Sequence, residues 1–482
     1  MALTKDFISG FSWEITGKII GQGVGFLVTL VLARLLSPGD FGMLALVNVL
    51  IAIASVLIDM GFGSSLVQKA VVCEEHYSAV FVVNAVIGLC LTGATILISA
   101  PFARFFGNEL LRPIVLATSP IFIITALGSV ARTKLYREQN FAALNLSIIC
   151  GTVVGGIIGI LMAVNGFGVW SLVAQSLVNA ATVTTYTYAC ARWFPSARFR
   201  LVYIKELWGY SSRIFAATIV GVVFGQLDKL LIGKLSKPAQ LGYYYRAKSL
   251  ESVIQTVLPQ SVLSAVFPSL SSLQNDNQRF LAVVKKLFSV LTYISIFLSG
   301  LFYLTSHDLI LLLFSDKWLP SVSFFRIITL SIFVYPLSAL TNAILASKGH
   351  GSEFLNLTLL RNAVLLPTYV VLYMVNITAF LYAYAALSIA SLFVSIWYVS
   401  QVIRMSSVNF IVSVAQGLVI CVPLVLLFSQ ATLIHSSIHL VGLLLMTTSY
   451  SIAYLATSLL LRNPGLSALR GTVRTMWCHA KM

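Results

Sequence analysis

Charged residues are scarce in this chain of 482 residues: they make up 10% of it, whereas a soluble domain carries about 25%. No long polar stretch separates the apolar segments, which recur from about residue 13 to about residue 461. A chain this poor in polar side chains cannot cover itself with polar surface in water. Lipid must therefore be its solvent, and no sizeable soluble domain is predicted.

Motifs that carry covalent or metal chemistry are lacking too. The six cysteines are scattered without CxxC or metal-ligand spacing, and the six histidines are equally dispersed. The sequence contains no HExxH, no GxSxG and no Walker-type loop. We therefore expect no catalytic residues, no metal and no cofactor. An ATP-driven pump is disfavoured because it would need a nucleotide site.

What the chain has in abundance is apolar helix. A membrane-spanning helix takes roughly 20 apolar residues, and fourteen segments of that kind are present. They are predicted at residues 13–33, 42–64, 78–100, 113–131, 143–164, 168–190, 208–233, 242–266, 283–304, 322–346, 355–375, 379–402, 410–430 and 437–461. The sequence thus predicts an all-α membrane protein of about 14 transmembrane helices.

The net charge of +16 is explained by membrane topology, so no nucleic-acid partner is predicted. With a cytoplasmic N-terminus, 18 basic residues near the spans fall on the inner side and 6 on the outer side. The positive-inside rule selects this orientation, which places both termini in the cytoplasm. No small-residue cleavage site follows the first apolar span, so we interpret it as a retained helix rather than a signal peptide.

The chain repeats itself at an offset of 200 residues. Residues 12–50 align with 212–250 without a gap, and ten of the 39 positions are identical. The identical pairs are Ser12/Ser212, Ile19/Ile219, Gly21/Gly221, Gly25/Gly225, Leu27/Leu227, Leu30/Leu230, Leu35/Leu235, Pro38/Pro238, Gly42/Gly242 and Leu50/Leu250. Three glycines and a proline do not match by hydrophobicity alone. Because the offset spans six helices, the two halves have the same orientation, as in parallel-repeat transporters.

This repeat predicts the domain organisation. Two six-helix lobes would be related by an axis along the membrane normal, and an extra helix pair would follow them. The predicted divisions are 1–191 (first lobe), 192–207 (cytoplasmic linker), 208–404 (second lobe), 405–461 (extra pair) and 462–482 (basic cytoplasmic tail). In such proteins the substrate path lies between the repeats.

Small residues recur every four positions on the first helix of each half. They are Gly17, Gly21 and Gly25, and then Ala217, Gly221 and Gly225. Such stripes let helix backbones approach closely, and they also weaken the helix. Two interpretations stay open: plain helix packing, or bending that makes these two helices the moving elements.

Charges inside apolar spans cost at least roughly 2.5–3.5 kcal/mol each near the bilayer centre, and they usually face a protein interior or a water-filled cavity. Basic residues outnumber acidic ones there by seven to four. The basic ones are Lys18, Arg213, Lys229, Arg246, Lys248, Arg326 and Arg361, and the acidic ones are Glu14, Asp59, Asp228 and Glu251. An excess of buried cation suits an anionic substrate, and the arginine fork matches phosphate oxygens.

Each of these charges has a structural alternative. Glu14 and Lys18 form an i, i+4 pair that can neutralise itself, and Arg213 and Arg326 can extend to the interface. Asp228 can pair locally with Lys229 or Arg246. The basic segment Arg132-x-Lys134-x-x-Arg137 either gathers an anionic lipid headgroup or only enforces topology.

Four segments resemble polysaccharide flippases of the Wzx type, in the multidrug/oligosaccharidyl-lipid/polysaccharide exporter superfamily. They are VLARLLSPGDFG (Val31–Gly42), DMGFGSSLVQK (Asp59–Lys69), LDKLLIGKLSKPAQLGYYYRAKSL (Leu227–Leu250) and VFPSLSSLQND (Val266–Asp276). The similarity extends in order over nearly the whole chain, and it is greatest to the colanic-acid-type lipopolysaccharide exporters.

The resemblance implies a flippase that moves an undecaprenyl-pyrophosphate-linked oligosaccharide across the bacterial inner membrane by alternating access. It implies a central cationic cavity, for which the candidates are Lys18, Arg213, Lys229, Arg246, Lys248 and Arg361. Asp59 and Asp228 are the candidates for ion coupling. The last two predicted helices, 410–430 and 437–461, would border a groove for the lipid tail. Membrane lipid and the polymerase and chain-length proteins of the same pathway are the implied partners.

Three rival functions remain. A cation-coupled multidrug exporter of the same superfamily should carry more buried carboxylate than this chain has. A membrane polymerase or ligase of the polysaccharide pathway usually has a large outer loop, and no predicted outer loop exceeds about 20 residues. A scaffold without transport would have no need for buried cations.

Overall fold

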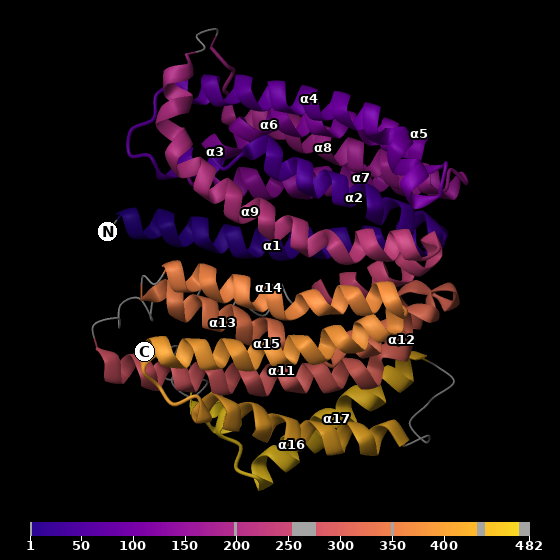
Figure 1. Ribbon diagram of the computed structural model, residues 1–482, viewed down its shortest axis with the longest axis vertical. Helices are drawn as coiled ribbons and strands as arrows, with labels where there is room; N and C mark the ends of the chain where they lie inside the picture. The colour runs from indigo at the N-terminus through magenta and orange to yellow at the C-terminus, as the bar shows by residue number, and fades with distance from the viewer. Residues whose placement is uncertain (1, 197–199, 253–275, 349–350, 431–438, 472–482) are drawn as a thin grey trace. The chain divides into compact units, whose positions relative to one another are not determined.

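The fold was analysed in a computed structural model that describes residues 2–196, 200–252, 276–348, 351–430 and 439–471. The described residues are helices joined by short turns and contain no strand. They divide into two compact units, Met1–Gly242 and Tyr243–Met482. Figure 1 shows the helices of each unit lying side by side along one direction.

Nine helices lie wholly within the described part of the first unit. They are α1 (Ala2–Leu35), α2 (Pro38–Asp59), α3 (Phe62–Gln68), α4 (Glu74–Phe106), α5 (Leu111–Thr118), α6 (Pro120–Arg137), α7 (Phe141–Val164), α8 (Val169–Ala191) and α9 (Leu201–Leu235). The chain is helical again from residue 238 to residue 252. The second unit contains α11 (Asn277–Phe314), the 3₁₀ turn η1 (Asp316–Trp318), α12 (Pro320–Thr329), α13 (Val334–Ser347), α14 (Gly351–Met374), α15 (Ile377–Ile403), α16 (Val408–Gln430) and α17 (His439–Leu460).

Twelve segments in the described part of the chain are long and apolar enough to cross a membrane, and they coincide with twelve of the fourteen predicted spans. The predicted span 168–190 is the helix α8, whose composition is more polar. Its Thr184 hydroxyl donates to the carbonyl of Ile124 at 3.1 Å, and its Tyr188 hydroxyl donates to that of Leu127 at 2.8 Å, both on α6. The predicted span 242–266 extends beyond the described residues.

Three predicted spans are interrupted, and two of the interruptions have a local cause. α2 ends at Asp59 because Met60 and Gly61 adopt positive φ angles of 44° and 75°, so the end predicted at residue 64 was wrong. The span predicted at 113–131 breaks into α5 and α6, and Pro120 begins α6. The span predicted at 322–346 contains a turn between α12 and α13.

The 200-residue repeat is visible in the helix boundaries. α1 and α9 end at Leu35 and Leu235, and the next helices begin at residues 38 and 238. Pro38 occupies the first turn of α2, and the Ser37 hydroxyl and the Asp40 carboxylate form a capping box there. The predicted linker 192–207 includes the start of α9, and the division into two lobes stays a prediction.

The two turns of the repeat pack directly on one another. A Cβ atom at Gly42 would overlap the carbonyl oxygen of Pro238, and a Cβ atom at Gly242 would overlap that of Pro38. The contact is reciprocal because the same proline-to-glycine segment occurs twice. The Gly42/Gly242 and Pro38/Pro238 matches of the sequence repeat are therefore explained by one backbone-to-backbone contact within the first unit.

The two glycine stripes differ in their surroundings. Gly17, Gly21 and Gly25 of α1 face side chains of α7, and a Cβ at Gly17 would lie 2.5 Å from the nearest of them. At Gly221 and Gly225 of α9, no described atom lies within 4 Å of the position of a Cβ. Close helix packing therefore accounts for the first stripe but not for the second.

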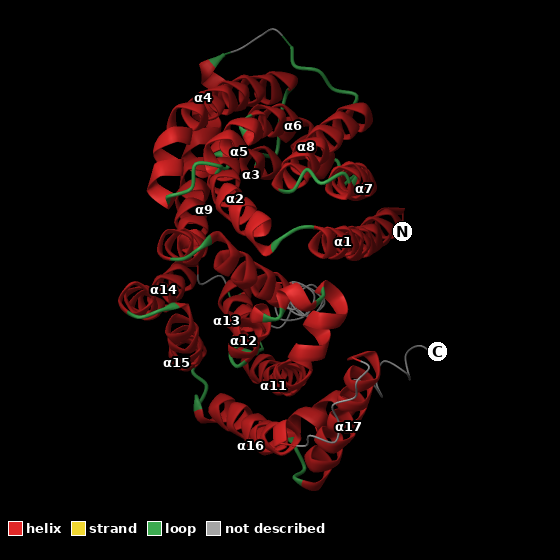
Figure 2. Cartoon of the chain, turned by 90° about the vertical axis from the view of Figure 1, so that its right-hand side faces the viewer, coloured by secondary structure: helices red, strands yellow, loops and turns green. Residues whose placement is uncertain are grey.

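In the second unit, α11 packs against four other helices. It contacts α12 and α13 as well as α16 and α17 (Figure 2). Its Phe288 ring meets Phe410 of α16 with ring centres 4.6 Å apart, and its Phe297 ring stacks on Tyr450 of α17 at 5.6 Å. These aromatic pairs attach the last two helices to the rest of the unit.

Candidate functional site

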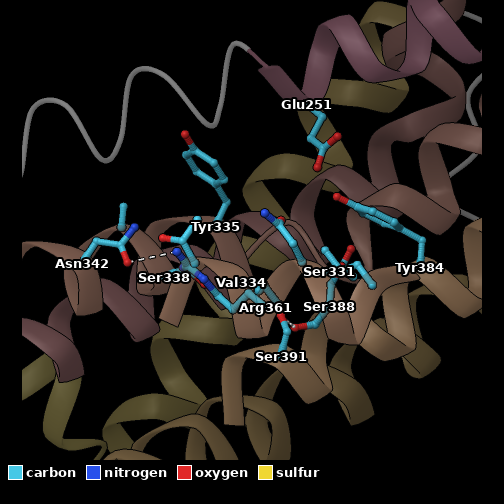
Figure 3. A pocket seen from close by; sticks show the side chains of 14 residues that line it. Glu251, Ser331, Val334, Tyr335, Ser338, Asn342, Arg361, Tyr384, Ser388 and Ser391 are labelled. Atoms are coloured by element: carbon cyan, nitrogen blue, oxygen red, sulfur yellow. Dashed lines mark hydrogen bonds between the residues drawn. The ribbon is translucent and has the colours of Figure 1, made fainter. Parts of the chain in front are cut away.

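A polar cavity of about 290 Å³ opens among the helices of the second unit (Figure 3). Most of the side chains that line it carry a hydroxyl, an amide or a charge, although the helices that supply them are strongly apolar. The lining residues are Glu251, Ser331, Val334, Tyr335, Ser338, Ala339, Asn342, Thr358, Arg361, Asn362, Leu365, Tyr384, Ser388 and Ser391. Polar groups inside a membrane helix are expensive, so their convergence marks this cavity as the leading functional candidate.

The lining side chains come from three stripes at helical spacing. One stripe runs Ser331, Tyr335, Ser338 and Asn342, the second contains Thr358, Arg361, Asn362 and Leu365 on α14, and the third runs Tyr384, Ser388 and Ser391 on α15. Residues three, four or seven positions apart share one face of a helix. The sequence predicted only Arg361 of this set as a site residue, although the periodicity of the polar residues could have indicated the others.

Arg361 is the basic group of the cavity. Its Nη2 donates to Oδ1 of Asn342 at 3.0 Å, as the dashed line in Figure 3 marks. Among the described residues, no carboxylate forms an ion pair with Arg361. A guanidinium has five N–H donors in a planar fork, and a neutral amide leaves its charge uncompensated. The site can therefore receive an anionic group.

Lys248 lies beside the cavity and belongs to a local charge pair. Its Nζ lies 2.6 Å from Oε2 of Glu251 and 5.0 Å from the centre of the Tyr384 ring. Both Glu251 and Tyr384 line the cavity. The Lys248–Glu251 pair is close to neutral, so the net positive charge of this cavity comes mainly from Arg361.

The structure places Arg246 outside the lining of both cavities described for this chain. Its side chain is 1% exposed, and its guanidinium carbon lies 4.7 Å from the centre of the Phe314 ring and 4.9 Å from that of Trp318. Cation–π contacts of this kind stabilise by about 2 kcal/mol when they are shielded from water. The surroundings of Arg246 indicate a packing role.

Replacement of Arg246 by alanine is expected to lower stability by about 2–4 kcal/mol, because it removes two ring contacts and leaves a void. Thermal unfolding of the purified protein in detergent, followed by size-exclusion chromatography, measures this. Arg246→Lys keeps the charge but loses the flat stacking surface, so an intermediate loss is expected. Unchanged stability combined with lost transport would instead give Arg246 a role in cargo binding.

A second cavity, of about 500 Å³, lies in the first unit where α2, α3, α6 and α9 meet. Asp59, one of the two predicted ion-coupling residues, lines it together with Arg132. The backbone N–H of Gly63 donates to Oδ1 of Asp59 at 3.1 Å. The remaining lining residues are Gly63, Ser64, Val67, Gln68, Thr133, Tyr136 and Tyr210. A carboxylate and a guanidinium thus share one polar cavity.

The three basic residues of the segment Arg132–Arg137 do not share one role. Lys134 pairs with Glu74 at 3.3 Å, and Arg137 donates to backbone carbonyls at the end of α3, including those of Lys69 at 2.7 Å and Ala70 at 3.0 Å. These two basic residues hold the α3 region and the start of α4 against α6. Arg132 is the one of the three that lines a cavity.

The other predicted site residues lie on the first helix of each half. Lys18 on α1 and Arg213 on α9 are exposed, and the side chain of Glu14 lies outside the described residues. Asp228 accepts from the backbone N–H of Lys229 at 2.8 Å, and Nζ of Lys229 donates to Gln226 at 2.7 Å. None of these lines either cavity, so their predicted roles in binding and coupling stay predictions.

Helices that span a membrane and converge on polar cavities define a multi-pass membrane protein with the fold of a transporter. A solved structure of the lipid II flippase MurJ in an inward-closed conformation matches 93% of this chain and 98% of its own, with a TM-score of 0.73 and 12% identity. An inward-facing multidrug resistance transporter of the MATE family matches 86% of this chain and 99% of its own chain, with a TM-score of 0.57 and 12% identity. These similarities establish the fold.

Residues 31–323 match the family described as "Polysaccharide biosynthesis protein", and the chain belongs to that family. The succinoglycan biosynthesis transport protein ExoT of Rhizobium meliloti is 26% identical over 57% of this chain and 56% of its own length. The lipopolysaccharide biosynthesis protein WzxC of Escherichia coli is 24% identical over 66% of this chain and 65% of its own length. The chain thus spans between about half and two thirds of the length of these curated relatives.

Proposed function

We propose that this protein is a flippase that moves an undecaprenyl-pyrophosphate-linked oligosaccharide repeat unit from the cytoplasmic to the periplasmic leaflet of a bacterial inner membrane. It would act by alternating access in the biosynthesis of a cell-surface polysaccharide, with both termini in the cytoplasm. The observation that carries the proposal is the polar cavity of the second unit, in which Arg361 faces neutral hydrogen-bonding groups.

The chemistry of this cavity suits a sugar diphosphate. The hydroxyls of Ser338, Thr358 and Ser388 and the amide of Asn362 are groups that exchange hydrogen bonds with sugar hydroxyls, and a guanidinium binds phosphate oxygens in pairs. A volume of 290 Å³ equals that of about ten water molecules. The cavity would therefore hold one part of the headgroup, while the polyprenyl tail stays in the lipid.

Ion coupling is assigned to Asp59 rather than to Asp228. Asp59 shares a cavity of about 500 Å³ with Arg132, so a cation or proton could reach its carboxylate and alter its interaction with that guanidinium. Asp228, by contrast, lines neither of the two cavities. Helices α16 and α17, which pack on α11, correspond to the predicted border of a groove for the lipid tail.

Reconstitution into vesicles tests the proposal directly. A fluorescent lipid-linked oligosaccharide placed in one leaflet should become accessible to a membrane-impermeant quencher or lectin on the other side. We expect the rate to rise at least tenfold above that of protein-free vesicles, because crossing the hydrocarbon would no longer require the headgroup to lose its hydration. A rate equal to that of protein-free vesicles would refute the flippase assignment.

Two further arms separate the rival functions. A lipophilic cationic dye replaces the oligosaccharide lipid, and efflux of the dye without movement of the lipid would indicate the drug exporter. Release of a longer glycan from the labelled lipid, measured by mass spectrometry, would indicate a polymerase or ligase. The neutral Lys248–Glu251 pair beside a cationic arginine favours an anionic cargo over a cationic drug.

A further inference from the structure

Two histidines and an aspartate far apart in the sequence come together where α11 meets α17. His307 and Asp308 lie near the end of α11, and His439 is the first residue of α17. Neither cavity includes them, and the proposed transport mechanism does not use them. Their dispersal in the sequence gives no metal-ligand spacing, so folding alone assembles this His–Asp–His cluster (His307, Asp308 and His439).

The donor atoms of the cluster converge on one point. Oδ1 of Asp308 lies 2.9 Å from Nδ1 of His439 and 3.3 Å from Nδ1 of His307. One donor atom from each residue lies within 4.8 Å of the others. Ligands bound tetrahedrally to Zn²⁺ at about 2.0–2.2 Å lie about 3.4 Å apart, so small side-chain rotations would bring all three onto one ion.

The three side chains of the cluster differ in exposure, and the pattern is the one that an open metal site requires. The Asp308 side chain is 11% exposed, whereas the imidazoles of His307 and His439 are 40% and 41% exposed. The carboxylate is thus held by the protein, and the imidazoles leave one side open to solvent. A metal ion can enter from that side, and a water molecule can complete a four-ligand shell.

The position along the helices places the cluster at a membrane boundary. Residues 287–306 of α11 contain no charged side chain and are long enough to cross the hydrocarbon, and His307 follows directly. The apolar run of α17 likewise starts at Leu440, directly after His439. Both helices therefore reach water at the cluster, on the face opposite to Lys285 and Lys286, which is the periplasmic face in the predicted orientation.

The donor set selects the class of metal. Two imidazole nitrogens and one carboxylate oxygen suit Zn²⁺ and the neighbouring transition metals, whereas Ca²⁺ and Mg²⁺ prefer shells of oxygen. We infer that His307, Asp308 and His439 form a binding site for a divalent transition metal of the Zn²⁺ type that clamps the final helix pair to α11. The inference is independent of which cargo is transported.

Zinc binding by the full-length protein tests the inference. The protein is purified through a tag without histidine, treated with a chelator and titrated with ZnCl₂ against a competing chromophoric chelator. We expect one equivalent to bind, and the dissociation constant to rise at least tenfold in His439→Ala and Asp308→Asn. His76→Gln removes a described histidine of α4 that is not part of the cluster, and it should leave binding unchanged. Ca²⁺ and Mg²⁺ should not compete.

Two further measurements distinguish the loss of the metal site from the misfolding of a variant. Zn²⁺ should raise the unfolding temperature of the unmodified protein by several degrees and leave that of Asp308→Asn unchanged, while both have similar zinc-free midpoints. X-ray absorption should show nitrogen and oxygen neighbours near 2.0–2.1 Å and no sulfur near 2.3 Å. No zinc binding at submillimolar concentrations, unchanged affinity in both variants, or a sulfur shell would each overturn the inference.

Discussion

Replacing Arg361 by alanine is expected to slow translocation of the lipid-linked oligosaccharide by about 30-fold or more. The reason is the loss of paired, charge-assisted hydrogen bonds to phosphate, which contribute about 2–4 kcal/mol when one partner is removed. Because 1.4 kcal/mol corresponds to a factor of ten, that range spans about 30- to 700-fold. The measurement is the leaflet-accessibility assay at matched protein density in the vesicles.

The surroundings of Arg361 make this prediction specific. Its neighbour in the cavity is the amide of Asn342, so the charge has no carboxylate partner among the described residues and its removal leaves no buried anion behind. The folded state should therefore tolerate the change, and the loss should appear in transport rather than in abundance. Arg361→Lys keeps the charge without the fork and should retain an intermediate rate.

A matched control is Lys348→Ala. Lys348 is also basic, but it donates to Asn277 at 2.9 Å and does not line the cavity. Its replacement should leave translocation within about twofold of the unmodified rate, since Lys348 lines neither cavity. Normal transport by Arg361→Ala at normal abundance would show that this cavity does not bind the charged part of the cargo.

The fold could be predicted largely from the sequence because lipid imposes a simple requirement. Every backbone group in the hydrocarbon must be satisfied, so each apolar run of about 20 residues becomes a helix. The positions of the spans followed from that rule, and the 200-residue repeat followed from identical residues at a fixed offset. The helix interruptions did not, because the turn at Met60 and Gly61 and the break before Pro120 depend on backbone angles and on neighbouring helices.

The candidate site was predictable only in part. Arg361 was predicted because a charge in an apolar run is costly, whereas single serines and threonines carry only the weaker signal of their helical spacing. Their hydroxyls can bond to their own helix, as Ser391 does to the carbonyl of Ser388 at 2.7 Å and Thr358 does to that of Phe354 at 2.9 Å. A polar residue that satisfies itself in this way looks the same in the sequence whether it faces lipid or a cavity.

Arg246 shows a second limit of prediction from the sequence. Its charge in an apolar segment predicted a cavity residue, but the rings of Phe314 and Trp318 enclose it. These rings lie about 70 residues further along the chain, so no local pattern could reveal the contact. Sequence reasoning thus located charges within apolar segments, and tertiary packing decided which of them face a cavity.

Replacing Gly42 or Gly242 by alanine is expected to lower the free energy of unfolding by about 2–3 kcal/mol. In each case the new methyl group would overlap a backbone carbonyl, of Pro238 or of Pro38, and no change of side-chain rotamer can relieve it. The expected result is a fall of several degrees in the unfolding temperature of the purified protein. Thermal unfolding monitored by intrinsic fluorescence measures it.

Glycines of the same helical repeat supply the control. At Gly221 and Gly225 of α9 no described atom lies near the position of a Cβ, so Gly221→Ala and Gly225→Ala should change stability by less than about 1 kcal/mol. The Gly42→Ala/Gly242→Ala double variant adds a sharper criterion. Both overlaps occur in one reciprocal contact, so a single displacement of the two turns relieves both. The double variant should therefore lose little more stability than either single variant, whereas additive losses would mean that the two turns do not share this contact.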